Sequence, residues 1–133
     1  MPIQVAWEIP QLMLAVKLHG TVTVEDILQF MEAYYTARDE SGNESLHLML
    51  YIDEAESWPD DPELIKKEIA SLPQISTKNY ACILQGPVEL YRLMQQVCFY
   101  MMALRYEGFP VREAALEFMR QIDPNIREAL SQN

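Results

Sequence analysis

The sequence has few of the cations that several functional classes require. Of its 133 residues only 10 are lysine or arginine, against 20 aspartate or glutamate, and the formal net charge is −10. Nucleic acids and anionic membranes are bound mainly through clustered cations, and those of this chain are few and scattered. We therefore expect no nucleic-acid partner and no membrane partner. The acidity instead favours a partner with a basic face.

Cysteine is nearly absent as well. Cys82 and Cys98 are the only two, and each lies within an apolar run. Two thiols provide neither a zinc site nor a disulfide framework, so we interpret both as small buried residues in a reducing compartment. No basic stretch leads into an apolar run at the start of the chain, and the longest apolar run, Val97–Leu104, is too short for a bilayer. These features predict a cytoplasmic protein, and we expect neither a metal nor a cofactor.

The apolar residues that are present begin with two alternating runs. Residues 3–9 and 12–18 alternate with a period of two on either side of Pro10-Gln11, which predicts an antiparallel hairpin. A helix start follows at Thr23, with Asp26 three residues later as in a capping box. Its apolar stripe continues to Tyr35, and a glycine at position 42 ends it.

The second half of the chain predicts alternating strands and helices. Residues 46–52 and 80–84 are apolar throughout, as strands covered on both faces are. Helices are predicted from Asp61 to Pro73, from Pro87 to about Tyr106, and over 111–122, with a loop over 53–61 and a loose tail over 126–133. The sequence thus predicts a single α/β domain over residues 1–133, with a mixed sheet of four to five strands and four helices.

Three stretches add detail to this pattern: Leu18-His19-Gly20 before the first helix, a central strand that ends in Asp53, and residues 112–118 of the last helix. With the order of elements, they resemble the STAS domain, the SpoIIAA-like fold of the anti-sigma-factor antagonists, over about residues 3–122. The resemblance implies a regulatory protein. Phosphorylatable members carry a Ser or Thr in an Asp-Ser-Ser-Gly-like run after the central strand. This chain has Ser57-Trp58-Pro59-Asp60-Asp61-Pro62 there, so we expect no phosphorylation, with Ser57 the nearest hydroxyl.

Few polar residues are candidates for a metal, catalytic or nucleotide site. The acids of residues 53–61 have no calcium-loop spacing, and a solvated loop that caps the following helix explains them better than a metal site. His19 and His47 have no ligand or nucleophile at a characteristic spacing. Gly86-Pro87 lacks the glycine-rich loop of a nucleotide site. We therefore predict a protein without enzymatic activity.

The predicted third helix is apolar on more than one side, which is more than a surface helix needs. Either neighbouring helices cover the excess, or part of it forms a homodimer or partner interface. The residues proposed for that interface are Tyr91, Phe99, Tyr100 and Met102. The leading hypothesis is accordingly a non-catalytic STAS-like regulatory or scaffolding protein that binds proteins, itself included.

Two alternatives remain. One is a carrier of a small hydrophobic ligand held between the sheet and the first and third helices, in a pocket that Met31, Tyr35, Met49, Met94 and Phe99 would line. The other is an enzyme that uses the acidic loop, which ranks last because no base, nucleophile or metal set converges in the sequence.

Overall fold

The computed structural model describes residues 2–42, 46–60, 79–102 and 104–131. Its elements in chain order are β1 (Ile3–Ile9), β2 (Met13–Thr21), α1 (Val24–Ser41), β3 (His47–Ser57), β4 (Tyr80–Leu84), α3 (Val88–Gln96), the π-helical turn η1 (Val97–Met101), β5 (Arg105–Phe109), α4 (Arg112–Ile122) and α5 (Pro124–Ser131). The helix predicted from Asp61 to Pro73 lies outside the described residues.

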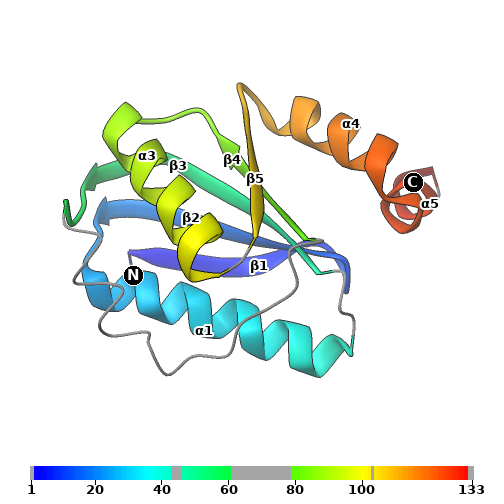
Figure 1. Cartoon of the computed structure of the whole chain (residues 1–133), viewed down its shortest axis with the longest axis horizontal. Helices are drawn as coiled ribbons and strands as arrows, with labels where there is room; N and C mark the ends of the chain where they lie inside the picture. The colour runs from blue at the N-terminus through cyan, green and yellow to red at the C-terminus, as the bar shows by residue number, and fades with distance from the viewer. Residues whose placement is uncertain (1, 43–45, 61–78, 103, 132–133) are drawn as a thin grey trace.

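The strands form one sheet in the order β1-β2-β3-β4-β5 (Figure 1). β1 and β2 are antiparallel, as the alternating runs predicted, and every later neighbour is parallel. Leu50 in β3 lies beside Ile83 in β4, so the two fully apolar runs are adjacent inner strands. The predicted α/β fold with a mixed sheet and an N-terminal hairpin is therefore confirmed.

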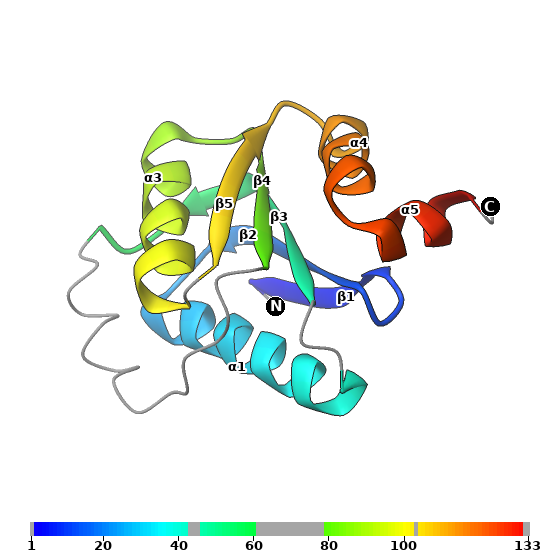
Figure 2. The same ribbon diagram turned by 45° about the vertical axis from the view of Figure 1, so that its right-hand side comes forward.

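Helices cover both faces of this sheet (Figure 2). On one face α1, α3 and η1 pack on alternate strand residues such as Val16, Leu50 and Ile83. On the other face α4 and α5 pack on the residues between them, including Met49 and Cys82. A strand directs successive side chains to opposite faces, so a run that is apolar throughout supplies both layers of the core.

Helix α1 forms where the sequence predicted it. Thr23 Oγ1 accepts from the Asp26 backbone N–H (3.2 Å), and the Asp26 carboxylate accepts from the Thr23 backbone N–H (2.8 Å). Gly42 ends the helix at φ 64°, a conformation that costs glycine little, and its N–H donates to the Arg38 carbonyl (3.1 Å). The long helix is thereby fixed at both ends beside β1 and β2.

Three predicted boundaries were wrong. β3 continues to Ser57, so residues 53–57 are strand and not loop, because they pair with the extended end of β2. The predicted third helix ends with η1, and residues 105–109 form β5 beside β4. The expected loose tail is largely helix α5, because the buried Ile126 anchors it to the second core layer.

Candidate functional site: the α3–β5 surface

Exposed apolar side chains gather where α3 and η1 lie along the outer strand β5. We call this region the α3–β5 surface and define it by Val88, Tyr91, Phe99 and Tyr106. Two shallow hollows follow one another along it, of about 420 and 410 Å³; Val88 and Tyr91 line the first, and Phe99 and Tyr106 line the second. Two of the four predicted interface residues, Tyr91 and Phe99, thus each line a hollow of the α3–β5 surface.

The Tyr91 ring occupies space that is free because residue 108 is a glycine and has no side chain. Gly108 is in β5, and a Cβ atom there would lie 2.9 Å from Tyr91 Cζ and 3.0 Å from its Cε2, closer than real side-chain contacts allow. The tyrosine ring therefore lies directly over the β5 backbone and is half-buried against the core. This close approach joins α3 to the edge strand and forms the floor of the first hollow.

Phe99 and Tyr106 form the exposed end of the same surface. Their ring centroids are 6.1 Å apart with an interplanar angle of 87°, an edge-to-face pair. Phe99 is 49% exposed and Tyr106 38%. The other residues that line this hollow are Arg92, Gln95 and Gln96, so no carboxylate is among its lining residues. An aromatic pair in an acid-free hollow has the composition typical of a protein interface.

The prediction for Met102 was wrong. Its side chain is completely buried in the core, so it cannot contribute to a surface of the folded chain. Helical spacing placed it outside because a regular α-helix was assumed, whereas η1 is π-helical and the Met102 N–H donates to the Val97 carbonyl five residues back (3.1 Å). The side chain of Tyr100, the fourth predicted interface residue, is outside the described part of the structure.

The predicted ligand pocket was also wrong in its geometry. Met31, Tyr35 and Met94 are buried in the core on the α1 face of the sheet. Met49 is buried on the opposite face, because it lies between Leu48 and Leu50 in β3. These four side chains therefore do not converge, and each is packed within a core layer, whereas the fifth, Phe99, is exposed on the α3–β5 surface.

Comparison with solved structures provides the deciding observation on the fold. The chain superposes on an uncharacterised protein of the DUF3478 family with a SpoIIAA-like fold, from Shewanella loihica, with a TM-score of 0.54. The match covers 87% of this chain and 90% of that one, at 17% sequence identity. This chain has a SpoIIAA-like fold. Neither a protein-family profile nor a curated protein matches its sequence.

The predicted resemblance is thus confirmed at the level of fold. At 17% identity the likeness concerns the backbone arrangement alone, and no activity follows from it. In this SpoIIAA-like domain the predicted nearest hydroxyl, Ser57, is the exposed last residue of β3. The stretch from Asp61, where the family's phosphorylated helix would begin, lies outside the described residues.

A buried histidine–aspartate pair, which the sequence did not reveal, lies on the α4–α5 side of the domain. His47 Nε2 donates to Asp123 Oδ2 (2.8 Å), and His47 Nδ1 accepts from the Tyr80 backbone N–H (3.0 Å). Asp123 Oδ1 also accepts from the Asn125 N–H (2.9 Å) and so caps α5. Burial lowers the pKa of His47 below its usual value, against the opposing effect of Asp123. Because both ring nitrogens are occupied, the neutral imidazole connects β3, β4 and α5.

A second polar cluster lies on the same face, near the β1 edge. Glu8 accepts from the Tyr51 hydroxyl and from Arg112 Nε (2.6 Å). Its side chain is only 7% exposed, so this is a largely desolvated carboxylate with two partners. Burial, reinforced by the neighbouring Glu8, raises the pKa of Tyr51. The cluster ties the start of α4 to β1 and β3.

The described residues offer neither a metal site nor a membrane span. Among them, no three or more His, Cys, Asp or Glu side chains group in a way that could hold a metal ion. Across the same residues, no helix combines the length and the hydropathy needed to cross a bilayer. His19, the other histidine, has a buried Nε2 without a hydrogen-bond partner and belongs to no such group.

Proposed function

We propose that this SpoIIAA-like domain is a non-catalytic regulatory or scaffolding protein that binds proteins, including a second copy of itself, through the α3–β5 surface. The observation that carries the proposal is the exposed Phe99–Tyr106 pair beside a hollow lined by Arg92, Gln95 and Gln96. A chain of net charge −10 repels its own copies over most approaches. An aromatic surface without carboxylates is where that repulsion is weakest.

The state of the usual catalytic groups supports the non-catalytic part of the proposal. Both nitrogens of His47 are engaged by Asp123 and the Tyr80 backbone, so neither is available to a substrate. Burial raises the pKa of Cys82 and of Cys98 to about 12, so neither thiol supplies a nucleophilic thiolate at neutral pH. These groups act in packing and in the connection of elements.

The cysteines also support a cytoplasmic location as part of the proposal. Cys82 and Cys98 are free and buried on opposite faces of the sheet. They therefore cannot pair with each other inside one folded chain, and neither is presented to an oxidising solvent. This is the state expected of thiols in a reducing compartment.

Binding to proteins is better supported than the carrier alternative. A carrier needs a space between the sheet and the helices that cover it. Met31, Tyr35 and Met94 fill that layer in the described part of the molecule, and each is packed against other core side chains. The exposed apolar residues along α3 and β5 lie outside that layer.

Sedimentation velocity over a concentration series tests the proposal. We expect the wild-type chain to dimerise and the double variant Phe99→Glu/Tyr106→Glu to be monomeric. Loss of two central aromatic residues, each contributing about 2 kcal/mol or more, raises a dissociation constant by about a thousandfold. The matched control is Val111→Glu/Ile122→Glu, which replaces exposed apolar residues next to and in α4 with the same two charges.

The control must dimerise like the wild type, and circular dichroism must show that all three proteins are folded. Wild-type protein that remains monomeric up to millimolar concentration would contradict the self-association that we propose. Equal loss of the dimer in the control and the test variant would assign the effect to net charge and remove the α3–β5 surface from the proposal.

A further inference from the structure

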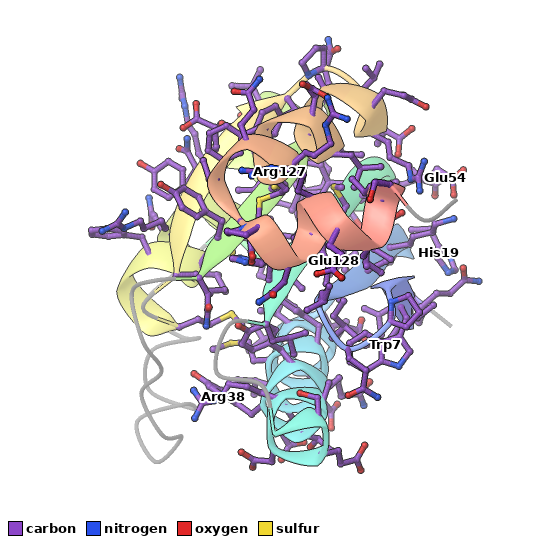
Figure 3. All side chains as sticks on the ribbon, turned by 90° about the vertical axis from the view of Figure 1, so that its right-hand side faces the viewer. Trp7, His19, Arg38, Glu54, Arg127 and Glu128 are labelled. Atoms are coloured by element: carbon purple, nitrogen blue, oxygen red, sulfur yellow. The ribbon has the colours of Figure 1, made fainter. Side chains whose placement is uncertain are left out.

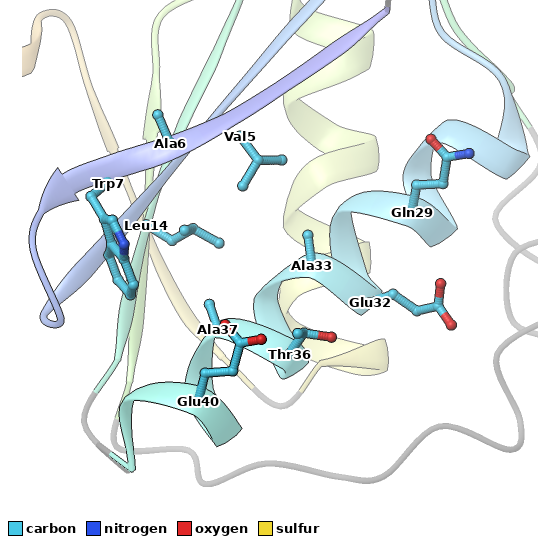
Figure 4. A pocket seen from close by; sticks show the side chains of 10 residues that line it. All are labelled: Val5, Ala6, Trp7, Leu14, Gln29, Glu32, Ala33, Thr36, Ala37 and Glu40. Atoms are coloured by element: carbon cyan, nitrogen blue, oxygen red, sulfur yellow. The ribbon is translucent and has the colours of Figure 1, made fainter.

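A second surface lies at the opposite edge of the sheet, between β1 and α1. β1 is the first strand in the sheet order and, among the described residues, pairs only with β2, so its outer main-chain groups face away from the sheet. A hollow of about 580 Å³ separates this strand from α1 (Figure 4). We call it the β1–α1 groove. An edge strand with an adjacent groove is the geometry that receives an added strand from a partner.

The strand side of the groove is apolar and exposed. Val5 and Trp7 lie two residues apart in β1 and therefore on the same face, and each is 41% exposed. Figure 4 shows both side chains directed toward α1, where Ala33 and Ala37 form the facing wall. Two small residues on the helix thus leave room beside a large aromatic ring. The space fits an apolar side chain from outside the molecule.

The helix side of the groove is acidic. Glu32 and Glu40 are exposed and are the only charged residues among those that line the hollow. Arg38, the cation in the last turn of α1, lies on the side of the helix away from Trp7 (Figure 3). The two carboxylates therefore have no cation beside them among the lining residues. The groove joins an apolar centre to a negative rim.

The spacing of the Glu32 and Glu40 carboxylates determines which sequence of a bound strand would fit the groove. Glu32 and Glu40 are eight residues apart in one helix, which at about 1.5 Å per residue is about 12 Å. An extended strand rises about 3.3 Å per residue, so about four of its residues span that distance. Residues i, i+2 and i+4 of a strand share one face. A strand laid along β1 would then place basic side chains at i and i+4 near the carboxylates, with an apolar side chain at i+2 between them.

We propose that the β1–α1 groove binds an extended segment of another protein with the pattern basic–x–apolar–x–basic, added to the sheet beside β1. The middle side chain occupies the space between Trp7 and Ala37, and the two cations pair with Glu32 and Glu40. A second copy of this chain does not fit, because two β1 edges in contact would bring both pairs of carboxylates together in an acidic dimer. The groove is at the β1 edge and the α3–β5 surface at the β5 edge, so the two proposals stand separately.

Fluorescence of Trp7 provides the test. The chain has two tryptophans, so Trp58→Phe makes Trp7 the only one. The probe is a synthetic peptide with lysines at i and i+4, leucine at i+2 and threonine at i+1 and i+3, capped at both ends. We expect a saturable blue shift of Trp7 emission, with affinity that falls as salt rises. Glu32→Gln/Glu40→Gln should weaken binding about five- to tenfold, as the loss of two exposed ion pairs implies.

The matched control is Glu117→Gln/Glu128→Gln, which removes the same charge from α4 and α5 and should leave the affinity unchanged. A peptide with both lysines replaced by glutamate, and one with leucine replaced by serine, should not bind. The proposal is overturned if the wild type gives no saturable shift, or if the two double variants bind alike. A blue shift that grows with protein concentration without peptide would identify a second copy as the occupant, and would also overturn it.

Discussion

Substitution of Asp123 by alanine gives the sharpest test of how α5 is joined to the sheet. The change removes the α5 cap, which is worth about 0.5–2 kcal/mol. It also leaves the buried His47 Nε2–H without an acceptor, which costs about 1–3 kcal/mol. Both side chains are largely buried, at 5% and 11% exposed. We therefore expect Asp123→Ala to lower the free energy of unfolding by about 1.5–5 kcal/mol, the sum of these two contributions.

Urea denaturation at pH 7.5, followed by circular dichroism, measures this difference. A double-mutant cycle with His47→Leu separates the two contributions. Replacing Asp123 by alanine removes the cap whether or not His47 is present, whereas the His47–Asp123 hydrogen bond is already absent in His47→Leu and cannot be lost a second time. Asp123→Asn should fall between wild type and alanine. An amide has one carbonyl oxygen, and it can accept from either His47 or the α5 backbone but cannot replace both carboxylate oxygens. Strict additivity of the two single variants, or a loss below 0.5 kcal/mol for Asp123→Ala, would refute this reasoning.

The pH dependence of stability provides a second arm of the same experiment. The pKa of His47 is lower in the folded chain than its unfolded value of 6.5. The unfolded state thus binds the proton more readily, and the contribution of the neutral imidazole is complete above pH 6.5 and lost as the pH falls below it. A protonated Nδ1 would also meet the Tyr80 N–H instead of accepting from it. We expect the stability of the wild type to decrease more steeply below pH 6.5 than that of His47→Leu.

Two further predictions concern the packing of Gly108 against Tyr91 and the capping box of α1. Gly108→Ala should destabilise the domain by about 1–3 kcal/mol through overpacking against Tyr91. Tyr91→Leu in the same chain should recover much of that loss in thermal unfolding, and the absence of recovery would place the strain elsewhere. Thr23→Ala should cost about 1 kcal/mol through loss of the α1 capping box, measured by urea denaturation, whereas Thr23→Ser should be close to wild type. Equal losses for alanine and serine would contradict a role for the hydroxyl.

The parts of the fold that were predicted correctly depend on local patterns. Alternation alone identified the β1–β2 hairpin, and Thr23 with Asp26 identified the start of α1. β5 was only an optional fifth strand in the prediction, because Arg105, Glu107 and Gly108 give it a polar sequence with no apolar run. It forms a strand because it pairs with β4, a contact that no local window contains.

The candidate site was predicted less well, for two physical reasons. A helical wheel assumes 3.6 residues per turn, and the π-helical η1 breaks that assumption where Met102 turns inward. The His47–Asp123 pair joins residues 76 positions apart, so only the folded chain brings them together. Tyr91 lies in α3, before η1, where the helical spacing still holds, whereas Phe99 is the third residue of η1.

Distance measurement by electron spin resonance tests the proposed interface most directly. Gln96→Cys places a spin label beside the Phe99–Tyr106 pair, and Thr36→Cys places one in the distant β1–α1 groove. Burial raises the pKa of Cys82 and Cys98 to about 12, so the label reacts with the introduced thiol. We predict a short distance between labels at position 96 of two copies, and a much longer one between labels at position 36. No dipolar coupling between labels at position 96 would contradict self-association through the α3–β5 surface.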